Sequence, residues 1–410
     1  MSSRCFSRRD PYLPRPTKLV SRSVQSLPTP SLVIDADKVR RNLRHLGEYA
    51  RGHNLKLRPH TKTHKSIRLA RMQLSEGGAT GLTVAKAGEA QLMAQVSDDI
   101  LVAYPVADPA RAAMLAELAR GVTVRVAVDS LTAAQVLADA AEHADSSIGL
   151  LVDIDVGLHR TGVQGPAAAL KLAQEVDRLA GSVTVRGAAA GQFEAAPAGR
   201  GARRAPVRLD GLFYYPGFIW SRPDQQADAL RGVDAVLEET LDLWHRSGLA
   251  APIVSGGSTP SAYQSHLVTR GTEIRPGTYI FYDLNSVRGG YCTLEEVAAT
   301  IECTVVSDAV PGQVVIDAGS KTLSSDRNAV APDSGHGCIL EFPRAKITKL
   351  TEEHGQVDVS LCDRSPKVGQ RVTVIPNHIC VCINLQDRVW WRESGQPAEA
   401  LQVDARGRVI

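Results

Sequence analysis

The segment KLRPHTKTHKS, residues 56–66, places three lysines, two histidines and an arginine within a short stretch of chain. Surface charge would explain such a cluster, and a lysine nucleophile is the alternative. Cationic neighbours such as Arg58 and Lys65 would lower the pKa of a nearby amine and keep it nucleophilic near neutral pH. The cluster follows a short strand-like run, so its side chains from His60 onward lie where a strand ends.

Three further strand-like runs end in polar residues: His159 and Arg160 after LLVDIDVG, Gly256 to Thr259 after APIVS, and Thr278 and Tyr279 after EIRPG. In a barrel of parallel strands, reactive residues collect at the carboxyl ends of the strands. The two glycines of SGGSTP allow backbone N–H groups to approach an anion closely, and Ser258 and Thr259 add hydroxyl donors near a helix start. These features indicate a phosphate site, although a plain turn between a strand and a helix is the alternative.

An amine at one strand end, a phosphate site at another and a second domain together suggest pyridoxal phosphate. This cofactor needs an amine for its Schiff base, donors for its phosphate and a polar partner for its ring substituents.

The pattern of elements predicts an α/β fold with two parts. From residue 30 to about residue 290, β-branched runs, among them SLVID, SVTVRG and YIFYD, alternate with amphipathic stretches, which is typical of βα units and a parallel sheet. About eight such units fit a (β/α)8 TIM-type barrel better than a doubly wound sheet, and no GxGxxG follows the first run. After residue 290, strands separated by turns predict a mostly antiparallel β domain.

We therefore divide the chain into a flexible tail at 1–26, a barrel at 27–290 and a β domain at 291–410. The Arg/Ser-rich start also resembles an organelle transit peptide, which is the less favoured reading. Residues 188–210 are rich in Ala, Gly, Arg and Pro and are predicted to be a disordered insertion. If the next strand begins at Gly211, the insertion enters on the barrel face away from the chemistry.

The composition argues against several classes of protein. The hydrophobic content of 43% and charged content of 22% are ordinary for a soluble globular protein. A net charge of +3 does not indicate a basic surface that would bind nucleic acid or an anionic membrane. No apolar run approaches the ~20 residues of a membrane span. Seven cysteines without a visible secretory signal favour free thiols in the cytoplasm.

Seven motifs carry a family resemblance: TPSLVID, LRPHTKTHKS, VDIDVGLHRTGV, SGGSTP, RPGTYIFYD, DAGSKTLSSD and PNHICVCINLQD. Together they resemble the D-threonine aldolase and D-serine dehydratase family of fold-type III pyridoxal phosphate enzymes, which is related to alanine racemase. The resemblance implies that Lys62, rather than Lys65, is the Schiff-base lysine and that Arg160 binds the ring oxygen of the cofactor. The remaining cofactor contacts assigned on this basis are His60, Tyr215, Gly256, Gly257, Ser258 and Tyr279.

The resemblance also implies a divalent metal held by His378 and Cys380. Residues two apart in a strand point to the same face, so this imidazole and thiolate can converge on one ion. A His and Cys pair suits zinc, with manganese as the alternative. Cys382 would lie on the same face of such a strand and is a candidate third ligand. Two protein ligands leave positions open for water or substrate.

These parts predict a lyase that acts on D-3-hydroxy amino acids, with the ring as electron sink and the metal as Lewis acid on the β-oxygen. If the β-hydroxyl loses its proton, the Cα–Cβ bond breaks, and D-threonine gives glycine and acetaldehyde. If Lys62 removes the Cα proton, the hydroxyl departs, and D-serine or D-3-hydroxyaspartate gives ammonia and a 2-oxo acid. The aldolase is our prediction and the dehydratase the alternative. The account requires the amine of Lys62 and the metal to meet on one substrate.

Two features keep further readings open. Cys380 resembles the dehydratase members, because the best-known aldolases carry an aspartate as the second ligand. Phe218 stands where relatives commonly carry a histidine, which leaves the proton-transfer group open and allows a non-catalytic cofactor-binding homologue. An alanine racemase would need a tyrosine base from the β domain and no metal pair. The resemblance also implies a homodimer, since fold-type III sites are generally completed across subunits.

Overall fold

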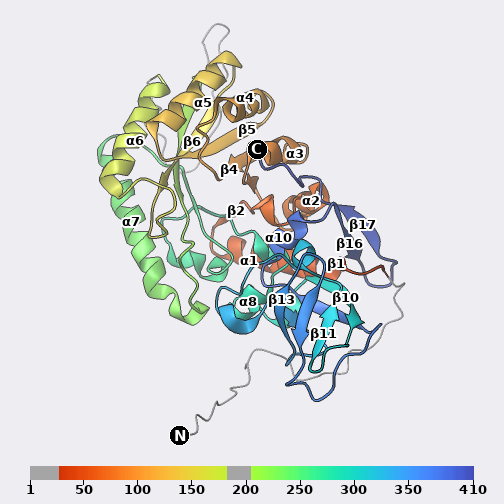
Figure 1. Ribbon diagram of the computed structural model, residues 1–410. Coiled ribbons are helices and arrows are strands. Elements are labelled where there is room, and N and C mark those ends of the chain that lie inside the picture. The colour runs from red at the N-terminus through yellow and green to blue at the C-terminus, as the bar shows by residue number, and fades with distance from the viewer. Residues whose placement is uncertain (1–26, 182–204) are drawn as a thin grey trace. The chain divides into compact units, whose positions relative to one another are not determined.

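The structure is a computed structural model that describes residues 27–181 and 205–410 (Figure 1). The predicted tail at 1–26, the run SVTVRG and most of the predicted insertion at 188–210 lie outside the described residues. Within the described ranges, no helix is long and apolar enough to cross a membrane.

Eight parallel strands form the sheet of the first compact unit, in the order β2-β9-β8-β7-β6-β5-β4-β3. A bridge between His60 and Thr83 joins the two ends of this order, so the sheet curls into the predicted (β/α)8 barrel (Figure 1). The strands are β2 (Lys56–Leu57), β3 (Leu82–Val84), β4 (Asp99–Val102), β5 (Thr123–Val128), β6 (Ile148–Ile154), β7 (Val207–Tyr214), β8 (Ile253–Gly256) and β9 (Glu273–Ile274).

Alternation along each strand separates the two faces of the barrel wall. In β6, Leu150 and Val152 pack outward into the large core shared with the helices, whereas Leu151 packs with Leu101 and Phe213 in a small cluster inside. The helices are α1 (Ala36–Gly52), α2 (Ile67–Ser75), α3 (Ala87–Met93), α4 (Pro109–Leu118), α5 (Leu131–His143), α6 (Pro166–Leu179) and α7 (Ala227–Arg246).

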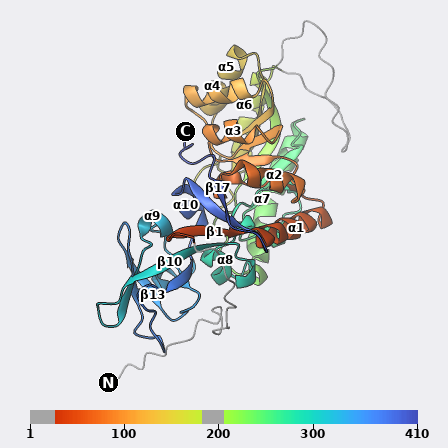
Figure 2. The same cartoon turned by 90° about the vertical axis from the view of Figure 1, so that its right-hand side faces the viewer.

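Two of the runs assigned to the barrel do not form barrel strands. SLVID is β1 (Ser31–Asp35), which pairs with β10 and β16 of the second sheet; Figure 2 shows β1 beside β10. YIFYD begins in the 3-10 turn η4 (Thr278–Ile280), and the shorter β9 completes the barrel instead. A short apolar run is compatible with either sheet or with a buried turn, so periodicity could not distinguish these cases.

The strand predicted to begin at Gly211 begins at Val207. Four residues assigned to the insertion are therefore strand, and the register against β6 shifts between Leu150 and Leu151. Gly211 occupies this irregularity with a φ of 144°, and a Cβ there would lie 1.9 Å from the carbonyl oxygen of Ile253. Only glycine fits such a close backbone approach.

The second unit is built on a mostly antiparallel sheet, as predicted, in the order β13-β14-β11-β10-β1-β16-β17, with β15 paired to β10 and β12. Its further strands are β10 (Ala299–Ser307), β11 (Gln313–Ile316), β12 (Cys338–Ile339), β13 (Lys346–Leu350), β14 (Gly355–Asp358), β15 (Arg371–Ile375), β16 (Arg388–Arg392) and β17 (Glu399–Gln402). Its helices are α8 (Leu284–Gly289), α9 (Ser320–Leu323) and α10 (Ile379–Asn384).

The two compact units are not separated by a single boundary near residue 290. One contains residues 280–402 and the chain up to Arg41, and the other contains residues 42–279 and 403–410. The chain crosses between them three times because β1 pairs within the second sheet, while Ala405 is buried in the core of the barrel unit.

A buried ion-pair network crosses the inside of the barrel. Arg58 donates to Glu273 at 2.9 Å and to Asp99 at 2.7 Å, and Arg125 contacts Asp99 and Asp210. The side chains of Arg58 and Glu273 are only 4% and 2% exposed, so the two charges compensate each other in a site with little solvent.

Replacing Glu273 should therefore cost far more than replacing an exposed carboxylate. Glu273→Ala leaves Arg58 with one carboxylate fewer and should lower the free energy of unfolding by about 3 kcal/mol, measured by denaturant titration. Glu238→Ala is the control, because Glu238 is about half exposed where it pairs with Arg270; its loss should be about 1 kcal/mol or less. Equal losses in the two variants would contradict a structural role for the buried network.

Candidate active site

The Lys62 segment follows β2 at the carboxyl end of the barrel. The strand ends at Leu57, and Thr61–Thr63 form the 3-10 turn η1, which His60 caps by accepting a hydrogen bond from the N–H of Lys62 at 3.4 Å. His60, Thr61 and Thr63 are buried, whereas Lys62 is exposed. The turn therefore presents the Lys62 amine away from the barrel wall.

Lys65 lies three residues further on in a different environment. Its amine forms an ion pair with Glu89 of α3 at 3.3 Å, and the two side chains are 7% and 2% exposed. Lys65 also has a left-handed backbone, with a φ of 51°. A Schiff base requires an amine that the cofactor can reach, and the Lys65 amine is enclosed with its carboxylate partner. This arrangement favours Lys62 over Lys65 as the nucleophile.

The cations expected to crowd Lys62 are compensated or neutral. Arg58 is paired with Glu273 and Asp99, and Lys65 is paired with Glu89. Burial lowers the pKa of His64 to about 4 and that of His60 well below its usual value. Arg58 and Lys65 are therefore not isolated cations, because each has a carboxylate partner that sequence reasoning did not place.

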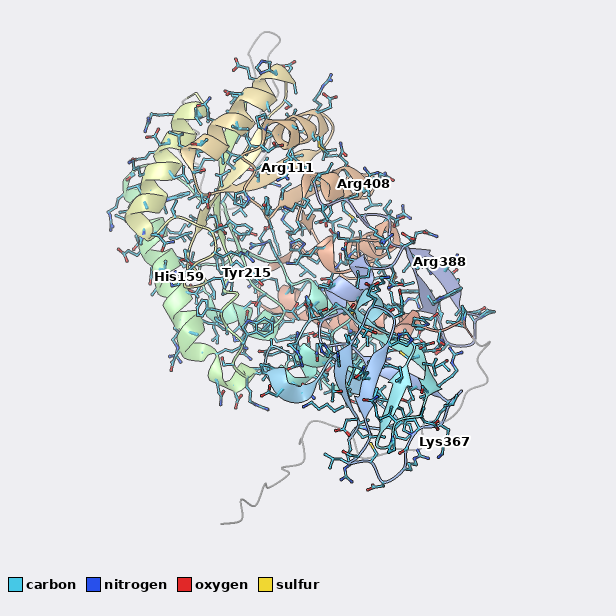
Figure 3. All side chains as sticks on the ribbon, viewed as in Figure 1. Arg111, His159, Tyr215, Lys367, Arg388 and Arg408 are labelled. Atoms are coloured by element: carbon cyan, nitrogen blue, oxygen red, sulfur yellow. The ribbon has the colours of Figure 1, made fainter. Side chains whose placement is uncertain are left out.

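Three cations lie close to His60 at this end of the barrel. After burial, the charges of Lys62, Arg275 and Arg160 lower the His60 pKa. Arg160 lies over the ring of Tyr215, with its Cζ 4.8 Å from the ring centroid. Figure 3 labels Tyr215 and the neighbouring His159, which lie on the loops that follow β7 and β6. The structure thus brings Lys62, His60 and Arg160 into one neighbourhood, with Tyr215 against Arg160.

Arg275 is a residue that the sequence analysis passed over. It is buried at the end of β9, where it donates to Ser255 Oγ at 2.6 Å and to the carbonyl of Tyr214 at 2.9 Å. Its guanidinium lies 3.7 Å from the ring centroid of Phe213. The available signal was its position in EIRPG, directly after a strand. Arg275 is held rigidly and supplies a fixed positive charge to the site.

Asp153 was also missed. It follows Leu151 on the inner face of β6 and is buried, and burial raises its pKa to about 6. A hydrogen bond from Thr161 and the charges of Arg275 and Arg160 lower the Asp153 pKa and partly offset the effect of burial. A carboxyl group therefore lies among the cations of this neighbourhood.

The SGGSTP loop follows β8 and has the features of an anion cradle. A Cβ on Gly256 would lie 1.9 Å from the ring of Tyr214, and Gly257 has a φ of 88°, so both positions require glycine. Ser258 Oγ lies 3.1 Å from Ser261 Oγ. Thr259 Oγ1 is buried and has no hydrogen-bond partner among the described residues. A buried donor without a partner, beside two glycines, suits a phosphate oxygen.

Tyr279 is fully buried, and burial raises its pKa above the usual value. Its hydroxyl accepts a hydrogen bond from Gln73 at 3.4 Å, and Gln73 also contacts His64 at 3.1 Å. The structure therefore links Tyr279 to the Lys62 segment.

The His378–Cys380 pair lies at a helix start and not in a strand. β15 ends at Ile375, and His378 is the N-cap of α10. Cys380 is nevertheless in hydrogen-bond contact with His378; together with Asp283 it raises the His378 pKa to about 11. The Nδ1 atom of His378 lies 2.9 Å from Asp283 Oδ2. This contact fixes the orientation of the ring, in the way that carboxylates orient metal-binding histidines.

The helix changes the role assigned to Cys382. Residues two apart in a helix lie on nearly opposite sides, so the prediction that Cys382 shares a face with Cys380 is wrong. Cys382 is buried, and its thiol contacts the carbonyl of His378 at 3.4 Å. Across residues 27–181 and 205–410, no group of three or more His, Cys, Asp and Glu side chains is arranged to hold a metal. His378 and Cys380 thus form a two-ligand candidate with open positions.

Phe218 occupies the loop after β7 and packs against the loop after β6. Its Cε1 would lie 3.2 Å from a Cβ built on Gly157, and the side chain is 39% exposed. The position where the family resemblance leads us to expect a histidine is therefore an apolar contact between two loops in this chain.

The neutral His64 gives the protein a defined pH dependence. Its pKa is about 4 when folded and 6.5 as the ordinary value, so the unfolded chain binds the extra proton first as pH falls. Its contribution to stability is complete above pH 6.5 and is lost between pH 6.5 and 4, by on the order of 3 kcal/mol. His64→Asn should flatten the decline of unfolding free energy over this window, whereas the exposed-site control His245→Gln should not. Identical pH profiles for His64→Asn and the unsubstituted protein would contradict the buried neutral imidazole.

Comparison with known proteins agrees with this fold along almost the whole chain. Residues 34–285 match the family model of the alanine racemase N-terminal domain, and residues 298–391 match that of a putative serine dehydratase domain. A 3-hydroxy-D-aspartate aldolase of Paracoccus denitrificans (strain Pd 1222) is 31% identical over 393 residues, which cover 93% of this chain and 92% of the relative.

Two solved structures have the same fold. A D-threonine aldolase from Filomicrobium marinum is 26% identical with a TM-score of 0.80, covering 94% of this chain and 97% of its own. A D-threo-3-hydroxyaspartate dehydratase from Delftia sp. HT23 is 27% identical with a TM-score of 0.79, covering 92% and 97%. A D-threo-3-hydroxyaspartate dehydratase with one cysteine replaced by alanine, solved in the metal-free form, is 26% identical with a TM-score of 0.78, covering 92% and 97%. This chain belongs to the D-threonine aldolase and D-serine dehydratase family, with an alanine racemase-like barrel, and is a fold-type III pyridoxal phosphate-dependent lyase.

Proposed function

We propose that this lyase acts on D-3-hydroxy amino acids with the help of a divalent metal, and that its reaction is the cleavage of D-threonine to glycine and acetaldehyde. The observation that carries the proposal is the contrast between the exposed Lys62 and the buried, ion-paired Lys65. It supports one free amine at the strand end where the family places its Schiff base.

The residues of the barrel unit fit pyridoxal phosphate. Lys62 would hold the cofactor, the loop of Gly256, Gly257 and Ser258 would bind its phosphate, and Arg160 would bind the ring oxygen. The unpartnered hydroxyl of Thr259 supports the phosphate assignment. The remaining assigned contacts are His60, Tyr215 and Tyr279. When bound, the cofactor supplies an electron sink for charge that develops at Cα.

His378 and Cys380 would hold the metal, and the thiolate favours zinc over manganese. A bound ion would act as a Lewis acid toward the β-hydroxyl. The Asp283 contact fixes the ring orientation of His378. The metal-free form of the cysteine-to-alanine variant of a dehydratase relative supports a cysteine ligand in the family.

The proton transfers separate the two candidate reactions. In the aldolase reaction the β-hydroxyl loses its proton. In the dehydratase reaction Lys62 instead removes the proton bound to Cα. Phe218 cannot serve as a base, so another group must accept the hydroxyl proton in an aldolase. The dehydratase remains the second candidate, and the cysteine at position 380 is the observation that favours it.

We also propose a cytoplasmic homodimer. The described residues contain six cysteines, none of which forms a disulfide, which supports a reducing environment. The dimer rests on the family resemblance.

Product analysis tests the proposed reaction. Purified protein supplied with pyridoxal phosphate and zinc should convert D-threonine to equimolar glycine and acetaldehyde and leave L-threonine unchanged; Lys62→Ala, which lacks the Schiff-base amine, should form neither product. Ammonia and a 2-oxo acid from D-serine or D-threo-3-hydroxyaspartate, without glycine, would instead establish the dehydratase. Turnover of none of these D-amino acids would support a non-catalytic homologue.

Measuring bound metal and activity in substituted proteins tests the proposed metal site. His378→Ala and Cys380→Ala should keep the visible absorbance of the cofactor but lose bound zinc and turnover. Cys382→Ala is the matched control and should retain both, because its thiol points into the interior. Asp283→Asn should weaken metal binding by about 10- to 100-fold. Full activity of His378→Ala and Cys380→Ala after chelation would remove the metal from the mechanism.

A further inference from the structure

The last eight residues of the chain, Val403–Ile410, belong to the barrel unit. We call this segment the strap. Ala405 is fully buried in the barrel core, and Val403 is 4% exposed. In Figures 1 and 2 the end of the chain lies beside α3, and Figure 3 labels Arg408 within the strap. The strap thus packs on the part of the barrel that follows β2 and β3.

The strap holds the residues immediately after Lys62. The N–H of Ala405 donates to the carbonyl of Lys65 at 2.9 Å. The N–H of Ile67, the first residue of α2, donates to Asp404 Oδ2 at 2.7 Å. Ser66 is the N-cap of α2 but makes no side-chain capping bond. Asp404 therefore supplies, from the other end of the sequence, the carboxylate that a helix N-terminus attracts.

The strap also holds α3, which carries the ion-pair partner of Lys65. The N–H of Gly88 donates to the carbonyl of Ile410 at 2.8 Å. A Cβ on Gly88 would lie 3.3 Å from both Arg408 Cβ and Ile410 O, so the two segments are in close contact. Glu89, the next residue of α3, pairs with Lys65. The Lys62 segment, α3 and the strap thus form a closed set of contacts.

We propose that the strap positions the Lys62 segment for cofactor binding, with Asp404 as its principal positioning residue. This inference rests on the proposed role of Lys62. Residues 61–66 form a short connection in which Lys65 adopts a left-handed backbone, a conformation that surrounding contacts must maintain. Asp404 and Ala405 provide two such contacts at the α2 end, and His60 caps the other end. Loss of the strap contacts should therefore loosen the turn that presents the Lys62 amine.

The experiment compares two helix N-terminal aspartates in the full-length protein with its cofactor. Asp108 accepts the N–H of Arg111 at 2.9 Å at the start of α4, so Asp108→Ala removes the same kind of bond at another helix. Asp404→Ala should raise amide hydrogen exchange in the peptide spanning 60–67 by about fivefold or more. It should also speed cofactor release, followed by visible absorbance after dilution, by a similar factor. Asp404→Asn, which keeps an acceptor oxygen, should restore most of both.

Each outcome decides the proposal. If Asp404→Ala matches Asp108→Ala, with lowered thermal stability but unchanged exchange in 60–67 and unchanged cofactor release, the strap is only structural and the proposal fails. If exchange in 60–67 rises but cofactor release does not, the strap orders the segment without serving the cofactor, which also refutes it. Failure of the proposed function is separate, because it would appear as cofactor attached to a lysine other than Lys62 in the unsubstituted protein.

Discussion

The ion pair between Lys65 and Glu89 distinguishes the two lysines that could bind the cofactor. Two lysines three residues apart have the same intrinsic reactivity, and their environments separate them. The side chain of Lys65 is buried in an ion pair with Glu89, while Lys62 is exposed after β2. One amine is thereby enclosed in the fold, and the other is the amine that we propose for covalent chemistry.

The closed parallel sheet gives this amine its surroundings. Because every barrel strand runs in the same direction, residues distant in sequence meet at one end. Lys62 follows β2, Arg160 follows β6, the SGGSTP loop follows β8 and Arg275 follows β9. Paired charges lie within the barrel below them, where Arg58 meets Glu273 and Asp99. The barrel thus separates charges that stabilise the fold from charges placed to act on a ligand.

The sequence was sufficient for features that depend on local pattern. Alternating apolar runs predicted the barrel and the antiparallel sheet, and strand ends located Lys62, Arg160 and the glycine loop. It was insufficient where the outcome depends on distant partners. SLVID has the pattern of a barrel strand, but in the structure it pairs with β10 and β16 of the second sheet. The sequence shows the charge of Arg58 but not its ion-pair partner Glu273, which lies 215 residues further along the chain. HICVC has the composition of a strand, but in the structure His378 is the N-cap of a helix. The contact between His378 and Asp283 joins residues far apart in sequence, so local pattern could not predict it. The meeting of Lys62 and the metal on one substrate stays a prediction.

Chemical trapping of the cofactor tests the central claim most directly. Borohydride reduction of the protein loaded with pyridoxal phosphate, followed by proteolysis and mass spectrometry, identifies the modified lysine. The account predicts one cofactor group per chain, attached at Lys62, with Lys65 unmodified. Attachment at Lys65, or at any lysine outside the 56–66 segment, would contradict it.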